Sequence, residues 1–141
     1  MKERSEKEAD LAEKENLMTK KVIVDTPVWI DHLIQPVQPL VQLLRDDRVV
    51  VHEDVLGELA CGNFRNRREQ LRNLSILDRV PRVQTEEVIS FIENQKLHGL
   101  GPGWIDLNLL ATALVGGYLI LTSDKKLQQL AVRFEVNAEG T

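Results

Sequence analysis

The chain has 141 residues, of which 43% are hydrophobic and 28% charged, and its formal net charge is −4. This length fits one domain, which at this size buries enough apolar surface to fold without disulfides. The single cysteine, Cys61, excludes an internal disulfide framework and favours a reducing compartment, which we take to be the cytoplasm. No apolar run approaches the roughly 18 residues that span a bilayer, and no signal-peptide core is evident, so we expect no contact with a membrane.

The first 20 residues are expected to lie outside the fold. Residues 1–21 hold six acidic and six basic residues, and Leu11 and Leu17 are isolated apolar positions. Such a segment can form a solvated helix, because Glu, Lys and Ala are good helix formers, yet it has almost no apolar face to bury. We therefore predict a frayed, charged extension over residues 1–20 and a folded domain over residues 21–141, with Met18 as an alternative start of translation.

The first half of the domain alternates short apolar runs with helical patterns. The run VIVDT (22–26) predicts a buried strand, and a helix then begins near Pro27 and stops before Pro36. A second helix is expected over 39–47 and a second strand over 49–52. The next helix, from residue 53, is expected to end at Gly62 as a C-terminal cap glycine, and an arginine-bearing helix follows over 64–77.

The second half continues the alternation. Thr85 is a candidate N-cap for a helix that runs to the loop GLGPG (99–103), and an apolar helix occupies 104–116. A third buried strand is expected over 118–123, a helix over 124–132 and a last edge strand over 133–137. Strands that alternate with helices predict an α/β sandwich around a mostly parallel sheet.

Acidic residues stand where parallel α/β proteins place their active sites, at the carboxyl ends of strands and the starts of the following helices. Asp25 ends the first predicted strand, Asp124 follows the third, and Asp106 lies at the start of the apolar helix. Two of them also have a purely structural interpretation, since Asp124 can cap its helix and Asp106 can interact favourably with a helix N-terminus.

Two of the acids are expected close to apolar surfaces. Asp106 interrupts a helix that is apolar nearly all round, and Glu58 lies beside the expected packing face of its own helix. A buried carboxylate costs several kcal/mol unless it is paired, protonated or bound to a metal ion. Converging carboxylates favour Mg²⁺ or Mn²⁺ over zinc, and the scattered His32, His52 and His98 offer no tetrahedral set.

The sequence also contains four strings that resemble the motifs of the PIN domain: VDTPVWIDHL (24–33), VLGELACG (55–62), GWIDLNLLATAL (103–114) and LTSDKKL (121–127). They occur in the order and at the separations of that family, and they look most like the VapC toxins of bacterial toxin–antitoxin pairs. The resemblance covers residues 21–135. It implies a three-layer α/β/α sandwich with a short, mostly parallel sheet and the activity of a metal-dependent endoribonuclease.

The resemblance also implies roles for individual residues. The acids that match the family's metal-binding and catalytic positions are Asp25, Glu58, Asp106 and Asp124, which would hold one or two Mg²⁺ or Mn²⁺ ions. Glu58 would either bind an ion or position the attacking water. Thr26 and Thr122 match small hydroxyl residues that support such carboxylates by hydrogen bonds.

Two positions depart from the family pattern. Pro27 stands where the family usually has serine, which removes a hydroxyl and a backbone N–H and would weaken support of the acids. Lys126 stands where some members carry another acid, which would reduce the occupancy of a second ion.

RNA binding requires positive charge outside an acidic pocket, because the pocket repels phosphate. The candidate RNA-binding residues are Arg65, Arg67, Arg68, Arg72, Lys125 and Lys126. The arginines are equally compatible with an ordinary solvated helix face. Trp29 and Trp104 flank two of the acids, and we expect both to pack under their helices, with stacking on an RNA base as the alternative.

The resemblance implies two protein partners, a cognate VapB-type antitoxin whose tail crosses the acidic groove and a second copy of the chain in a homodimer. Two alternatives to the nuclease remain. A receiver-like signalling module also gathers acids around Mg²⁺, but it needs a phosphoacceptor aspartate ending a central strand, and here the second strand ends at His52. A catalytically silent PIN-like module that binds without cutting is disfavoured by the four acids, and Pro27 keeps it open.

Overall fold

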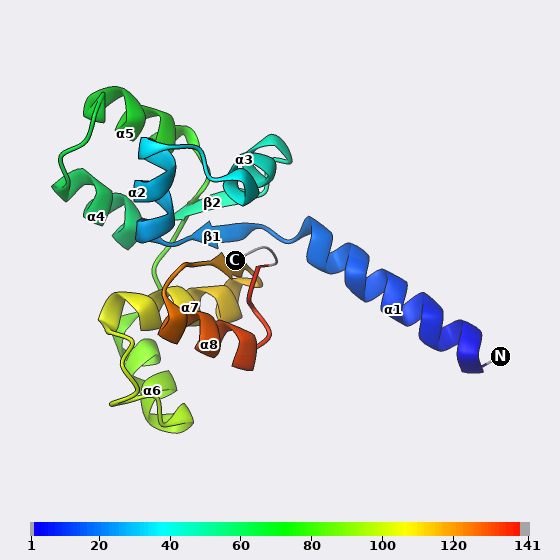
Figure 1. The fold of residues 1–141 in the computed structure, drawn as a ribbon. Helices are drawn as coiled ribbons and strands as arrows, with labels where there is room; N and C mark the ends of the chain where they lie inside the picture. The colour runs from blue at the N-terminus through cyan, green and yellow to red at the C-terminus, as the bar shows by residue number, and fades with distance from the viewer. Residues whose placement is uncertain (1, 139–141) are drawn as a thin grey trace.

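The computed structural model describes residues 2–138, apart from the side chains of residues 2–4, 15 and 16, so positions 139–141 of the predicted domain lie outside the described part. Its centre is a parallel sheet of β1 (Val22–Val24), β2 (Val49–His52), β3 (Arg79–Val80) and β4 (Leu119–Leu121), in the order β3-β2-β1-β4 (Figure 1). All residues of β1, β2 and β4 are buried, as expected for strands covered on both faces.

The helices form a layer on each side of this sheet (Figure 1). One layer holds α2 (Thr26–Ile34), α3 (Gln38–Arg45), α4 (Glu53–Cys61) and α5 (Arg67–Ile76). The opposite layer holds α6 (Thr85–Gln95), α7 (Trp104–Gly116) and α8 (Lys125–Arg133). The predicted three-layer α/β/α sandwich with a parallel sheet is thus confirmed.

The core lies between the sheet and these two layers. Ile23 and Ile120, on adjacent strands, are fully buried and pair in register. Helix α7 packs deepest into this core, because all of its residues from Leu107 to Ala113 are buried. The apolar composition of α7 that was evident in the sequence therefore reflects burial inside the sandwich.

Several boundaries differ from the predicted ones. Strand β3 was not predicted, because it has only two residues and Arg79 is exposed. Conversely, the expected last edge strand is reduced to one bridge between Ile120 and Asn137. Helix α5 begins at Arg67, three residues later than predicted, after Asn66 in a left-handed conformation with φ 55°. Gly62 follows α4 as expected but has φ −84°, so it does not act as a left-handed cap.

The charged segment before the sheet forms one continuous helix, α1 (Lys2–Thr19), which projects from the body of the molecule (Figure 1). The sequence allowed such a solvated helix because Glu, Lys and Ala have high helix propensity, and fraying of the segment stays a prediction. The described side chains from Ser5 to Thr19 are exposed. The guanidinium of Arg48 donates to the carbonyl oxygens of Leu17 and Lys20, at 2.9 Å each, and so attaches the end of α1 to the body.

Among residues 2–138, no helix combines the length and hydrophobicity needed to cross a membrane.

Candidate active site

The strand order creates a switch point between β1 and β4. The chain moves from β1 to β2 and β3 on one side and then returns to place β4 on the other side of β1. In open parallel sheets, the crevice outside the carboxyl ends of the strands at such a point is the usual place of a ligand site. Asp25 directly follows β1, and Asp124 lies three residues after β4. The topology thus brings both acids to the same crevice.

Asp25 is the buried acid of this crevice, with 4% of its surface exposed. Its Oδ1 accepts a hydrogen bond from the backbone N–H of Thr26 at 2.8 Å, and its Oδ2 accepts one from the hydroxyl of Thr122 at 2.8 Å. It also forms the N-cap of α2, where Pro27 occupies a first-turn position that requires no backbone N–H. The proline therefore leaves the hydrogen bonds of Asp25 intact.

Glu58 lies on α4 and is an exposed side chain, although the sequence placed it beside a packing face. Its Oε1 accepts a 2.7 Å hydrogen bond from the hydroxyl of Thr26. Thr26 therefore contacts both acids, through its backbone N–H to Asp25 and through its side chain to Glu58.

Asp106 and Asp124 both lie at the starts of helices. Asp106, in the first turn of α7, is half-buried, and its Oδ2 accepts from the backbone N–H of Gly103 at 3.2 Å. Asp124 is exposed and caps α8, since its Oδ1 accepts from the N–H groups of Lys126 and Leu127 at 3.0 and 2.9 Å. The structural interpretations of these two acids are therefore correct, and a capping oxygen leaves the second carboxylate oxygen available for another ligand.

All four acids line one open cleft of about 680 Å³. The lining contains no lysine, arginine or histidine and consists of Asp25, Thr26, Pro27, Ile30, Glu58, Gly103, Trp104, Ile105, Asp106 and Asp124. Among the described residues, none of these acids forms an ion pair with a basic side chain. The cleft thus gathers four carboxylates whose negative charge no basic side chain of the lining neutralises.

This concentration changes the acidity of two carboxyl groups. The pKa of Asp25 is raised to about 6, chiefly by burial and in smaller part by the charges of Asp106 and Glu58, against the hydrogen bonds from Thr122 and Thr26 that lower it. Burial also raises the pKa of Asp106, opposed by the Gly103 N–H and reinforced by the charges of Asp124 and Glu58. The mutual repulsion means that a cation in the cleft would stabilise all four acids.

The donor chemistry of the cleft fits a hard divalent cation, because every charged group is a carboxylate and the adjacent hydroxyls orient two of them. Within the described part of the chain, however, no three His, Cys, Asp or Glu side chains are gathered closely enough to hold an ion as they stand. Glu58 and Asp124 are the exposed members of the set, and the hydrogen bonds from Thr26 and from the start of α8 hold one carboxylate oxygen of each.

The predicted RNA-binding residues fall into two groups, neither of which lines the cleft. Arg65 precedes α5, Arg68 and Arg72 lie exposed on that helix, and Lys125 and Lys126 are exposed at the start of α8. Arg67 differs from the others, because its guanidinium donates to the carbonyl oxygens of Gly62, at 3.0 Å, and Ala60 at the end of α4. Arg67 therefore has a structural role that the sequence did not indicate.

The two tryptophans have different environments. Trp29 is 3% exposed and packs in the core, as predicted. Trp104 is 40% exposed and contributes to the cleft lining, so the prediction that it packs under its helix is wrong.

The sequence analysis gave no role to His52, which is fully buried and hydrogen-bonded. Its position at a strand end, directly before a helix with acids in its first turn, is the signal that could have identified it as a cap.

Comparison with known proteins agrees with this geometry. The family model of the PIN domain matches residues 22–133. Over 108 residues, the chain is 42% identical to the protein named Ribonuclease VapC32 in two strains of Mycobacterium tuberculosis, CDC 1551 / Oshkosh and ATCC 25618 / H37Rv. The aligned region covers 76% of this chain and 87% of each relative. The family model spans the sheet, both helix layers and all four acids, so the chain belongs to the PIN-domain family and, within it, is a VapC-type protein.

Proposed function

We propose that this chain is a metal-dependent endoribonuclease that hydrolyses RNA phosphodiester bonds and acts as the toxin of a toxin–antitoxin pair. One observation carries the proposal: four carboxylates from separate segments line a single cleft at the switch point of the sheet, without a compensating base among the described residues. The ribonuclease name of the relatives in Mycobacterium tuberculosis supports the same activity for this chain.

PIN-domain VapC ribonucleases act in general with divalent metal ions, and for this chain we propose Mg²⁺ or Mn²⁺, which prefer carboxylate oxygens. Asp25, Asp106 and Asp124 would be the main ligands, directly or through water, and Glu58 would complete the set. When bound, the ion supplies charge neutralisation at the phosphate and lowers the pKa of a bound water.

The residues of the chain have distinct tasks in this scheme. The hydroxyl of Thr122 and the N–H of Thr26 hold both oxygens of Asp25 and favour its ionised form. The hydroxyl of Thr26 fixes one oxygen of Glu58. The other carboxylate oxygen of Glu58 would accept a proton from water or bind the ion.

Binding of the RNA strand requires cations outside this cleft. We assign this role to Arg65, Arg68 and Arg72 around α5 and to Lys125 and Lys126 at the start of α8, all of which are exposed. Arg67 would contribute least, because two backbone carbonyls of α4 already occupy its guanidinium.

We also propose the partners that follow from this function. A VapB-type antitoxin would inhibit the enzyme by covering the acidic cleft, and uncompensated carboxylates there favour a basic segment as the inhibitor.

A homodimer is supported by exposed apolar residues on the α7–α8 side of the sandwich, Leu114, Val115 and Val132. An RNA substrate and the single cysteine support a cytoplasmic location.

Cleavage of total bacterial RNA by the purified protein tests this proposal. Reactions would contain Mg²⁺, Mn²⁺ or EDTA, and the Asp25→Asn and Asp106→Asn variants would serve as controls. We expect discrete fragments that require the metal ion and that are absent with both variants. Variants that cut as well as the wild type would contradict the proposal, and metal binding without any cleavage would instead indicate the catalytically silent module.

A further inference from the structure

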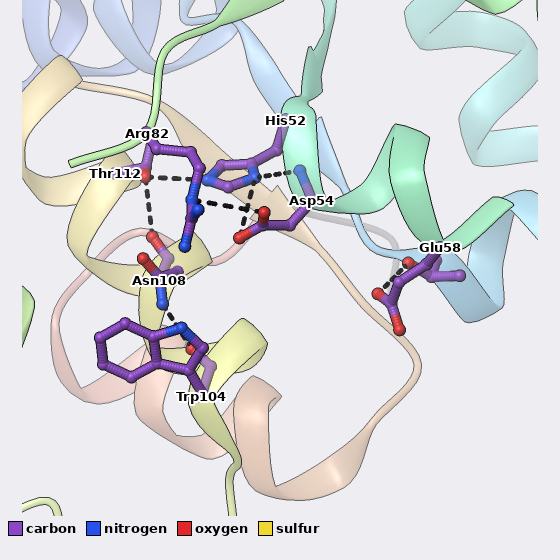
Figure 2. Close-up of polar contacts among 8 residues, drawn as sticks. His52, Asp54, Glu58, Arg82, Trp104, Asn108 and Thr112 are labelled. Atoms are coloured by element: carbon purple, nitrogen blue, oxygen red, sulfur yellow. Dashed lines mark hydrogen bonds and ion pairs between the residues drawn. The ribbon is translucent and has the colours of Figure 1, made fainter. Parts of the chain in front are cut away.

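A buried histidine lies at the junction between the sheet and helix α4. His52 ends β2, has no exposed surface, and accepts a hydrogen bond from the backbone N–H of Asp54 at its Nδ1, at 3.0 Å (Figure 2). Because Nδ1 accepts, the proton of the neutral ring is on Nε2. Nε2 lies 3.2 Å from the hydroxyl oxygen of Thr112 on α7, so the ring donates across the sheet to the opposite helix layer.

The contact continues along α7 toward the cleft. The hydroxyl of Thr112 donates to the carbonyl oxygen of Asn108 at 2.7 Å, which leaves its oxygen to accept from His52. The side-chain amide of Asn108 then donates to the carbonyl oxygen of Trp104 at 2.8 Å. Trp104 is the first residue of α7, and Asp106 is two residues further on. Figure 2 shows this series of contacts from His52 down to Trp104.

The surroundings of His52 keep the ring in its neutral form. Burial lowers the pKa of His52 and Arg82 lowers it further, while the charges of Asp54 and Glu53 oppose this change. The Nε of Arg82 lies 3.3 Å from Oδ1 of Asp54, so the nearest carboxylate is itself paired (Figure 2). The neutral ring can therefore act at both nitrogens, as an acceptor for α4 and as a donor for α7.

The two helices joined by this ring carry two of the cleft acids. Glu58 lies on α4, five residues after the helix begins at Glu53, and Asp106 lies in the first turn of α7. Both carboxylates line the same cleft, whose lining holds no basic side chain, so their negative charges repel each other. Repulsion favours separation of the two helix segments, and a fixed link between them opposes that separation.

We propose that His52 is a positioning residue for the metal site: its bond to Thr112 sets where the first turn of α7, and with it Asp106, lies relative to Glu58. This inference rests on the proposed nuclease function and adds to it a residue that does not touch the cleft. It distinguishes two roles of one ring, the cap of α4 through Nδ1 and the link to α7 through Nε2.

The two roles can be separated by substitution. Thr112→Val removes the hydroxyl while keeping the shape of the side chain, and Thr112→Ser restores the hydroxyl. His52→Asn keeps an acceptor for the Asp54 N–H but has no donor that reaches Thr112. Ser75→Ala is the matched control, because Ser75 makes a similar hydroxyl-to-carbonyl bond, to Arg72 at 2.7 Å, on a helix outside the cleft lining.

Each variant would be assayed for kcat and KM at saturating Mn²⁺, for Mn²⁺ affinity by calorimetry, and for amide hydrogen exchange in EDTA. With Thr112→Val and His52→Asn we expect about a tenfold lower kcat with KM little changed, and weaker Mn²⁺ binding. We also expect faster exchange of the Leu107 amide, which bonds the Gly103 carbonyl at 3.0 Å in the first turn of α7. Thr112→Ser and Ser75→Ala are expected to resemble the wild type.

The outcomes separate this inference from the proposed function. A lower melting temperature for Thr112→Val and His52→Asn, with wild-type kcat, Mn²⁺ affinity and Leu107 exchange, would overturn the positioning role and leave a purely structural network. If the wild type binds Mn²⁺ but cleaves no RNA, the nuclease proposal fails, and the Mn²⁺ affinities and the Leu107 exchange rate still decide the role of His52. If Thr112→Val does not fold, His52→Asn and Thr112→Ser provide the same comparison.

Discussion

The hydroxyl of Thr122 donates a 2.8 Å hydrogen bond to Oδ2 of Asp25 and thereby joins the ends of β4 and β1, which are 97 residues apart in the sequence. The same hydroxyl oxygen accepts the backbone N–H of Asp124 at 3.1 Å. One fully buried threonine therefore fixes the positions of two acids of the cleft. Asp25 is aligned through its side chain and Asp124 through its backbone.

Replacement of Thr122 by valine is expected to weaken metal binding at neutral pH. The Thr122 hydroxyl lowers the pKa of Asp25, so its loss raises that pKa and makes a bound proton compete more strongly with a cation. In calorimetric titrations with Mn²⁺ over a series of pH values, the curve of affinity against pH should move to higher pH. Thr122→Ser retains the hydroxyl and should follow the wild type, and identical curves for valine and wild type would refute this role.

The raised pKa of Asp25 predicts a pH-dependent loss of stability in the metal-free protein. The pKa is about 6 in the folded chain against 3.8 for an ordinary aspartic acid side chain, so the folded state keeps this proton to higher pH than the unfolded state does. The free energy of unfolding should therefore fall as pH rises from about 4 to about 6, by about 3 kcal/mol from this group, and change no further above that range.

Asp25→Asn tests this expectation, because it removes the titrating group. In urea unfolding with EDTA at pH 7.5, we expect Asp25→Asn to be more stable than the wild type. Addition of Mn²⁺ should stabilise the wild type and leave the variant almost unchanged. A variant that is less stable than the wild type in EDTA would show that the buried charge of Asp25 is not a source of instability.

Arg67 and its neighbours on α5 are predicted to respond differently to substitution. The Arg67 guanidinium bonds two carbonyl oxygens at the end of α4, so Arg67→Ala should cost about 1–2 kcal/mol of stability. Arg68→Ala and Arg72→Ala should keep the melting temperature and weaken RNA binding, with a smaller dependence of affinity on salt.

Binding of a fluorescent RNA to the Asp25→Asn protein at several salt concentrations measures this difference without cleavage. Two outcomes would contradict the assignment. Unchanged affinity for both Arg68→Ala and Arg72→Ala would mean that α5 is an ordinary solvated helix, and an unchanged melting temperature for Arg67→Ala would mean that its two bonds contribute little.

Much of the site could be predicted from the sequence, because strand ends and helix starts are local features. The strings around β1 and β4 place Asp25 and Asp124 at strand ends, and a parallel sheet brings the carboxyl ends of its strands to one edge. The loop before Trp104 likewise places Asp106 at a helix start. These three positions follow from patterns of a few residues each.

The rest depends on contacts between distant segments, which local patterns do not encode. The bond from Thr26 to Glu58 crosses 32 residues and that from His52 to Thr112 crosses 60. The two-residue strand β3 forms because β2 supplies its partner, and its own sequence carries no strand pattern. The exposure of Trp104 likewise depends on what the neighbouring elements leave uncovered.

Calorimetric titration of the metal-free protein with Mn²⁺ tests the central claim most directly, namely that four carboxylates of one cleft form a metal site. The proteins would be the wild type, Asp25→Asn, Glu58→Gln, Asp106→Asn, Asp124→Asn and, as a control, Asp31→Asn, which removes an exposed acid of α2 outside the cleft lining. We predict that each of the four cleft variants binds Mn²⁺ at least about tenfold more weakly, while the Asp31 variant binds like the wild type. Equal affinity in all six proteins would contradict the account.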